Sequence, residues 1–400
     1  MGDKYTNREQ QERDAQAFAE QVDSLDSSKL PTANIMVAGI TGTGKSTLIN
    51  AVFGEDFAET GVGRPVTQNI NEYNSADLPI QIWDTVGLEL DAETTMKSIK
   101  DMKEKIAQKA ETKDQFDRIH AIWYCVNSRS SRYQGAELDF IKSLHSIGVP
   151  FIIVLTQCIG VEEEVNAFEQ EIRKINNGMG LNDVDVVQVC AQEFKMRGVP
   201  PIPAFGLDKL INLTTKKIPT FIKSGFVAAQ RVSKVQKREL CEDIIIIGIK
   251  SAKEGFWDKV PLANIVRANN RVMGMFRKIG LVYNAQIPEA SIQRITEASG
   301  LDFGNVFFGL LSPIDFGYNE KVMELLNEKK KEDGFSVDVG TFKKSDRVAV
   351  MIAYYGYTFI DSLEELWEEL TQSQMKDIDM VCDNLVRIIN RRLKEKRSRY

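Results

Sequence analysis

One glycine-rich segment constrains the fold more than any other feature of the chain. Residues Gly39–Ser46 read GITGTGKS and fit the pattern G-x-x-x-x-G-K-S of a phosphate-binding loop. The apolar run Asn34–Ala38 before the loop predicts a buried strand, and Thr47–Phe53 after it carries apolar residues at helical spacing. A strand, a loop and a helix in this order point backbone N–H groups and a helix N-terminus at phosphate oxygens. The alternative, an ordinary glycine-rich turn that binds no phosphate, does not account for the predicted strand before the segment and the predicted helix after it.

The loop and the start of its helix supply most of the expected phosphate ligands. Lys45 is expected to bridge the β- and γ-phosphates, and the Ser46 hydroxyl is expected to ligate Mg²⁺, the one cofactor we predict. The residues expected to hold the nucleotide phosphates are Gly39, Thr41, Gly42, Thr43, Gly44, Lys45, Ser46 and Thr47.

Two segments further along the chain complete the expected metal and γ-phosphate site. Pro79–Trp83 predicts a strand, and Asp84 at its end is placed to hold Mg²⁺ through water. The Gly87 N–H is placed to meet the γ-phosphate. Thr67, in a segment expected to be a polar loop over residues 63–67, is predicted to close over the metal. The expected metal ligands are therefore Ser46, Thr67 and Asp84.

Apolar runs recur at the spacing of a doubly wound parallel sheet. Helical patterns separate them, and from about residue 218 the alternation of strands and helices stops. The expected fold class is therefore α/β, a doubly wound P-loop domain followed by an all-α domain. The expected domains are an amphipathic helix in 1–30, the P-loop domain in 31–217 and a helical domain in 218–400. Further strands are expected over 119–126, 150–156 and 185–190, with helices over 92–113, 134–147, 161–177, 226–257, 265–283, 288–300, 348–369 and from 375.

Composition limits where the chain acts. A net charge of −6 argues against general binding to nucleic acid, and no stretch approaches the roughly 18 apolar residues of a membrane span. Five scattered cysteines without a C-x-x-C pair predict reduced thiols in a cytoplasmic protein. Cys125, Cys158 and Cys190 are expected to be small buried hydrophobes. The helix in residues 1–30 packs on the body or, alternatively, makes peripheral contact with a membrane surface.

Three segments together carry a family resemblance. Ala38–Gly54, Gly63–Gln68 and Trp83–Glu89 resemble the Era-like GTPases of the TRAFAC class, and are most similar to the YfjP-type group. The resemblance covers roughly residues 33–195. It implies a G domain that binds guanine nucleotide with Mg²⁺ and hydrolyses GTP as a switch. Members of that group often carry a C-terminal helical domain, which implies that nucleotide state is relayed to the helices here.

The guanine-reading segment departs from the family pattern. Such GTPases place [N/T]-K-x-D after the fifth strand, and the Asp accepts two hydrogen bonds from guanine. This chain has Thr156, Gln157 and, at the Asp position, Ile159, which accepts none. The loss should lower guanine discrimination by about a few kcal/mol, unless Glu162 or Glu163 takes over. The N–H of Ala191 is expected to meet the guanine oxygen.

Hydrolysis is the second departure. Leu88 follows the D-x-x-G motif where Ras-type enzymes have a glutamine, which implies slow turnover. Arg64 stands three residues before Thr67, the spacing of an arginine finger acting in cis in G-protein α subunits; the alternative is a solvated arginine. The expected catalytic residues are Lys45, Thr67, Gly87 and Arg64.

The sequence leaves three functions open. The first is a slow GTPase switch, the second a catalytically inactive nucleotide-binding scaffold, and the third an ATP-dependent or unselective nucleotide hydrolase. Besides guanine nucleotide, the expected partner is an unknown protein or a second copy bound through the G domain.

Overall fold

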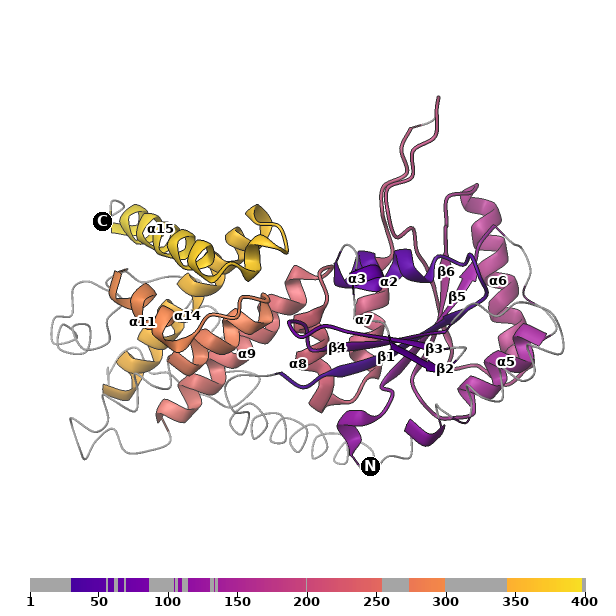
Figure 1. Ribbon diagram of the computed structural model, residues 1–400, viewed down its shortest axis with the longest axis horizontal. Helices are drawn as coiled ribbons and strands as arrows, with labels where there is room; N and C mark the ends of the chain where they lie inside the picture. Colours follow the sequence, from indigo (N-terminus) through magenta and orange to yellow (C-terminus); the bar gives the residue numbers. More distant parts are fainter. Residues whose placement is uncertain are drawn as a thin grey trace, which may run out of the picture. The chain divides into compact units, whose positions relative to one another are not determined.

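A computed structural model shows two compact units (Figure 1). Leu30–Ser233 form the first, and the described residues from Lys234 onward belong to the second. The helix expected within residues 1–30, and most of the one expected over 92–113, lie outside the residues that the structure describes. The described residues are 30–54, 57–60, 64–67, 70–85, 104, 107–109, 114–129, 133, 136–198, 200–253, 273–298 and 344–397.

A mixed sheet forms the centre of the first unit. In the described part of the chain it has seven strands in the order β2-β3-β4-β1-β5-β6-β7. The central strands pair in parallel and β2 and β3 are antiparallel, which confirms the expected α/β class. The strands are β1 (Ala33–Gly39), β2 (Arg64–Thr67), β3 (Ile70–Asn74), β4 (Ile80–Thr85), β5 (Ala121–Asn127), β6 (Phe151–Thr156) and β7 (Asp185–Gln188).

Both faces of the sheet are covered, so its central strands are apolar without alternation. All of β1 is buried. Ile35 and Val37 belong to the core cluster that includes residues of α2, α7 and α8, whereas Met36 and Ala38 belong to the cluster with α5 and α6. The helices of this unit are α2 (Lys45–Phe53), α3 (Phe57–Thr60), α5 (Ala136–His145), α6 (Glu162–Gly178), α7 (Leu207–Lys217) and α8 (Thr220–Ala229), with a 3₁₀ turn at Gln115–Asp117.

The prediction of a polar loop over residues 63–67 is wrong for Arg64–Thr67. These residues form β2, which pairs with β3, and β3 pairs with β4. The strands were hard to recognise because three of the five residues of β3, which reads INEYN, are asparagine or glutamate, types depleted in strands. Pro65 is tolerated because β2 is the edge strand and its register shifts between Pro65 and Thr67.

The prediction of a nearly continuous helix over 226–257 is also wrong, because a turn separates α8 from α9 (Lys234–Lys253). Gln230 is fully buried, and its Oε1 accepts hydrogen bonds from the N–H groups of Val232 (2.6 Å) and Ser233 (2.7 Å). The Arg231 N–H donates to the Val52 carbonyl at the end of α2, at 2.8 Å. The glutamine side chain thus gives the backbone a turn in place of helical hydrogen bonds. The division at Ser233 lies C-terminal to the expected one at 217, since α8 packs on β1 and β4.

The second unit is helical throughout its described elements. Helix α14 contacts α9 and α15, and α15 also contacts α11. The elements after α9 are α11 (Glu289–Ala298), α14 (Lys344–Glu369), a 3₁₀ turn (Gln374–Lys376) and α15 (Ile378–Arg397). Residues 273–282 are helical as expected, and the rest of the 265–283 helix lies mostly outside the description. No described helix is long and apolar enough to cross a membrane.

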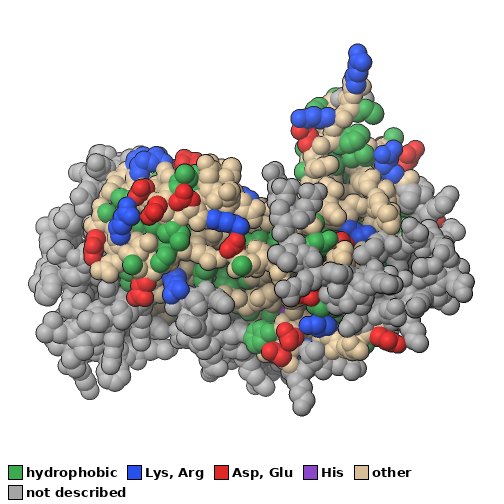
Figure 2. Space-filling model, viewed as in Figure 1, with side chains coloured by type: hydrophobic (Ala, Val, Ile, Leu, Met, Phe, Trp, Pro, Cys, Tyr) green, Lys and Arg blue, Asp and Glu red, His purple; other side chains and the backbone are tan. Residues whose placement is uncertain are grey.

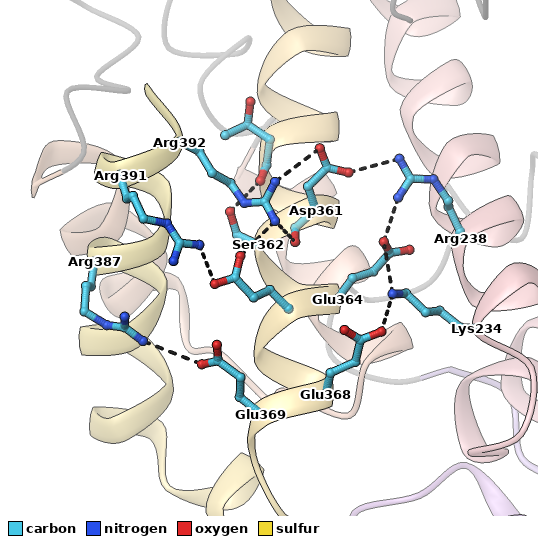
Figure 3. A network of polar contacts seen from close by, with 12 residues as sticks. Lys234, Arg238, Asp361, Ser362, Glu364, Glu368, Glu369, Arg387, Arg391 and Arg392 are labelled. Carbon is cyan, nitrogen blue, oxygen red and sulfur yellow. Dashed lines mark hydrogen bonds and ion pairs between the residues drawn. The ribbon is translucent and has the colours of Figure 1, made fainter. Parts of the chain in front are cut away.

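Acidic side chains of α14 form ion pairs with cations of two neighbouring helices (Figure 3). Glu364 accepts from Arg238 of α9 at 2.7 Å and from the Tyr283 hydroxyl at 3.1 Å. Asp361 accepts from the same arginine at 3.0 Å. On the other side Glu365 accepts from Arg392 of α15 at 2.8 Å. The three helices are thus joined by charge as well as by apolar packing.

Candidate nucleotide site

The phosphate-binding loop follows β1 at the carboxyl end of the parallel strands. Gly39 has φ +146°, and a Cβ there would lie 2.5 Å from the Cys125 carbonyl oxygen, so only glycine fits against β5. Gly44 has φ +83°, in the left-handed region that other residues rarely adopt. The Thr43 hydroxyl donates to the Ile40 carbonyl at 2.8 Å and closes the turn. The glycines of the motif therefore have the structural role that its pattern predicts.

Lys45 begins α2 and is 8% exposed. Its Nζ donates to the carbonyl oxygens of Gly39 (2.9 Å) and Ile40 (3.3 Å), which hold the ammonium against its own loop. Ser46 and Thr47 are exposed on the first turn, so neither hydroxyl is covered by the described residues. The loop thus combines a buried cation with accessible hydroxyls and N–H groups at a helix start, an arrangement suited to phosphate.

Asp84, the penultimate residue of β4, lies beside this loop, because β4 pairs with β1 and Asp84 is the register partner of Val37. Asp84 is 7% exposed, and its Oδ1 is buried with no hydrogen-bond partner among the described residues. Burial raises its pKa to about 6, against the opposing effect of the Lys45 charge. A buried oxygen that lacks a donor fits a hydrated Mg²⁺, which keeps several waters and uses few protein ligands. Asp84 therefore fits the expected metal.

Replacing Asp84 by asparagine is expected to stabilise the nucleotide-free protein at pH 7.5 by on the order of 2 kcal/mol. The folded-state pKa of Asp84 is raised, so the folded protein holds its proton up to about pH 6 and the unfolded chain releases it near pH 4. The penalty is absent at low pH and fully present above pH 6. Denaturant unfolding of wild type and Asp84→Asn at pH 7.5 and at low pH measures the penalty. A stability gain of the variant that persists at low pH would contradict this explanation.

The last residue of β6 and the first residue of the loop after it are hydrogen-bonded to the phosphate-binding loop. The Thr156 hydroxyl donates to the Thr43 carbonyl at 2.5 Å, and the Gln157 Nε2 donates to the Gly42 carbonyl at 2.9 Å. Gln157 has φ +53°, a strained conformation for a residue other than glycine. Two residues expected near the base therefore also fix the shape of the loop expected to bind the phosphates.

Ser128 completes this connection and was not expected from the sequence. Its hydroxyl donates to the Gln157 carbonyl at 2.7 Å, and its N–H donates to the Thr156 carbonyl at 3.0 Å. The signal that points to it is position, since it directly follows β5, the neighbour of β6. A serine there can brace the next loop at the carboxyl edge of the sheet.

The position expected to read guanine carries no carboxylate. Ile159 is half-buried, and its N–H donates to the Gln157 carbonyl at 2.7 Å. Glu162 and Glu163 lie exposed in the first turn of α6, and neither is hydrogen-bonded to the described residues of the loop after β6. Ala191 is partly buried against the core beyond the end of β7. In this conformation neither glutamate takes over the hydrogen-bond acceptor role that Ile159 cannot perform.

All five cysteines are free; Cys125, Cys158 and Cys190 are buried as expected, and Cys241 and Cys382 are buried as well. Burial raises the pKa of the Cys125 thiol to about 12 and that of Cys158 to about 11, so both are protonated at neutral pH. The Cys158 Sγ donates to the Leu155 carbonyl at 3.1 Å. These thiols pack as small hydrophobes beside the loops and are not nucleophiles.

The γ-phosphate side of the site is described only in part. Gly87 and Leu88 lie outside the described residues, and Arg64 and Thr67 are described by backbone alone, in β2. The roles expected for these residues therefore stay predictions.

Comparison with known proteins agrees with this geometry. Residues 34–157 match the family model described as "50S ribosome-binding GTPase". A search of curated proteins found no match.

Several solved structures resemble parts of the chain. A probable GTP-binding protein engB is 17% identical over 48% of this chain and 99% of its own, with a TM-score of 0.32. A variant of Aquifex aeolicus Era bound to GDP·AlF₄⁻ is 15% identical over 56% and 69%, with a TM-score of 0.31. The elongation factor SelB from Methanococcus maripaludis is 15% identical over 48% and 34%, also with a TM-score of 0.31. The family match covers less than half of the chain and lies within the first unit, over the residues that include the phosphate-binding loop.

Proposed function

We propose that the chain is a nucleotide-operated switch that binds GTP with Mg²⁺ and hydrolyses it slowly. The observation that carries the proposal is a phosphate-binding loop that holds a buried Lys45 and accepts hydrogen bonds from Thr156 at the end of β6 and from Gln157 just after it. This arrangement joins the expected phosphate and base sites in one unit. The family match over the same residues supports guanine nucleotide as the ligand.

The chain's own residues have distinct proposed tasks. Lys45 and the N–H groups at the start of α2 bind the β- and γ-phosphates and stabilise negative charge that develops during phosphoryl transfer. Ser46, Thr67 and Asp84 would hold Mg²⁺, which supplies neutralisation of phosphate charge when bound. Gln157 packs its stem against the base, and the Ala191 N–H meets the guanine oxygen.

Switching follows from contacts that exist only with the γ-phosphate. Thr67 and Gly87 are proposed to bind it, which orders the two segments that carry them, and hydrolysis releases both. Arg64 is proposed to assist from β2. The change is proposed to reach the helical residues from Lys234 onward, as the YfjP-type resemblance implies.

Ile159 favours a second candidate, a nucleotide hydrolase that does not select guanine. Calorimetry of the nucleotide-free protein with GTP, GDP, ATP and ADP, each with Mg²⁺, decides between the two. Guanine nucleotides binding at least about tenfold tighter, a difference of roughly 1.4 kcal/mol, supports the GTP switch. Equal affinities support the unselective hydrolase, and binding of none of the four contradicts both.

Replacing Ile159 by aspartate is expected to raise the preference for GTP over ATP by at least about 100-fold. A carboxylate there accepts two hydrogen bonds from guanine that adenine cannot donate, each charged bond contributing about 1.5 kcal/mol or more. Calorimetry with both triphosphates measures the ratio. Val161→Asp is the matched control, because Val161 is exposed two residues further along. An equal change in both variants would show a general charge effect.

A further inference from the structure

Residues 190–205, here called the arm, leave the first unit as a two-stranded hairpin between β7 and α7. Figure 1 shows it rising away from the sheet. Two antiparallel bridges hold it, Cys190 with Phe205 and Phe194 with Ile202. The Phe194 N–H donates to the Ile202 carbonyl at 2.9 Å, and the reverse bond is 3.0 Å. The arm is thus ordered, although a two-stranded hairpin standing alone in water is only marginally stable.

The arm exposes apolar surface with positive charge at its end. Met196 is 55% exposed and Phe205 39% exposed. Lys195 and Arg197 flank the methionine, and Figure 2 shows Lys and Arg side chains near the tip of the arm above hydrophobic ones. Lys195 pairs with Glu193 of the arm at 2.7 Å, but Arg197 forms no ion pair with any described residue. Met196 between two cations is therefore the part of the arm that a partner could contact.

The chain carries a surface of complementary composition at the start of α6. Val161, the residue before the helix, is 56% exposed. Glu162, Glu163 and Glu164 follow it, and all three side chains are exposed. Among the described residues none of the three carboxylates forms an ion pair or hydrogen bond. The surface at the start of α6, an apolar side chain beside unpaired anions, is therefore complementary to the arm, where an apolar side chain lies beside cations.

Topology places the two surfaces on one edge of the sheet. Helix α6 begins just beyond the end of β6, and the arm begins just beyond the end of β7. The two strands are parallel neighbours, with Leu155 paired to Gln188. Both surfaces therefore lie at the carboxyl edge of the sheet. A two-fold axis facing this edge can bring the arm of each copy to the α6 start of the other.

We propose that the arm docks on the start of α6 of a second copy, so that two chains associate through reciprocal contacts of Lys195, Met196 and Arg197 with Val161 and the three glutamates. A second copy is the occupant because the complement is present on the chain itself. The contact uses exposed charges, so it is expected to weaken as salt rises. The dimer would cover the loop around Ala191, which immediately precedes the exposed part of the arm.

Two charge-reversal variants test the proposal in the full-length protein. In the arm variant Lys195→Glu is combined with Arg197→Glu, and in the helix variant Glu162→Lys is combined with Glu163→Lys. Sedimentation velocity over a concentration series compares wild type, each variant and an equimolar mixture. Wild type should dimerise, and each variant alone should associate at least about tenfold more weakly, because like charges then face each other in both contacts.

The mixture separates this contact from any other. An arm variant and a helix variant restore opposite charges in both reciprocal contacts, so together they should form a heterodimer, identified by native mass spectrometry. Circular dichroism and melting temperature confirm that each variant is folded. Wild type that stays monomeric throughout, variants that dimerise as wild type does, or a mixture that gains no heterodimer would each overturn the proposal. The readout needs no nucleotide, so it is independent of the proposed GTPase activity.

Discussion

Replacing Lys45 by methionine is expected to weaken GTP binding at least about 100-fold and to reduce single-turnover hydrolysis to background. Lys45 is 8% exposed, and its ammonium has only the carbonyls of Gly39 and Ile40 as described partners. A phosphate oxygen bonded to this cation gains a charge-assisted hydrogen bond in a poorly solvated place, where it is strongest. Methionine keeps the buried stem and removes the charge. Calorimetry and phosphate release measure the two effects.

The matched control is Lys216→Met. Lys216 is exposed in the last turn of α7, in the same compact unit, and the substitution makes the same change of charge. Its affinity and turnover should equal those of wild type. If wild type itself releases no phosphate above the Lys45→Met background while still binding GTP, the chain is a catalytically inactive scaffold. If Lys45→Met binds GTP as wild type does, the loop does not bind the phosphates.

Local features of the sequence were sufficient to predict the centre of the first unit. The phosphate-binding loop needs glycine at residues 39 and 44 for backbone reasons that any homologous loop would share, and the buried parallel strands around it are continuous apolar runs. Such strands are recognisable because burial on both faces removes the polar positions that would obscure them. Burial of Cys125, Cys158 and Cys190 could be predicted because all three lie at or just past the ends of these strands.

Features that depend on tertiary contact were missed. The strand β3 pairs with β4, and its two asparagines and one glutamate, which are depleted in strands, outnumber its two strand-favouring residues. The break between α8 and α9 depends on the buried side chain of Gln230, a residue with good helix propensity. Ser128 and Gln157 contact loops 29 and 115 residues away in sequence, and no local pattern specifies such pairs.

Replacing Glu364 by alanine is expected to destabilise the helical unit by about 3 to 5 kcal/mol, the second of the two largest effects. The Glu364 side chain is 11% exposed and accepts from Arg238 and from the Tyr283 hydroxyl. Burial lowers the pKa of Arg238, but the charges of Glu364 and Asp361 outweigh it and hold the pKa above its usual value. Alanine leaves the guanidinium with fewer anions and the hydroxyl without its acceptor.

The matched control lies on the same helix. Glu369 of α14 is 49% exposed and its ion pair with Arg387 of α15 spans 3.6 Å, so Glu369→Ala is expected to change stability by less than about 1 kcal/mol. Urea unfolding followed by far-ultraviolet circular dichroism compares the two variants, with the nucleotide-bound first unit as an internal reference. The difference between them arises because an exposed anion is replaced by water when it is removed, whereas the environment of Glu364 has little room for water. Equal losses in the two variants would mean that burial does not strengthen the Glu364 contacts and that α14 is held by apolar packing alone.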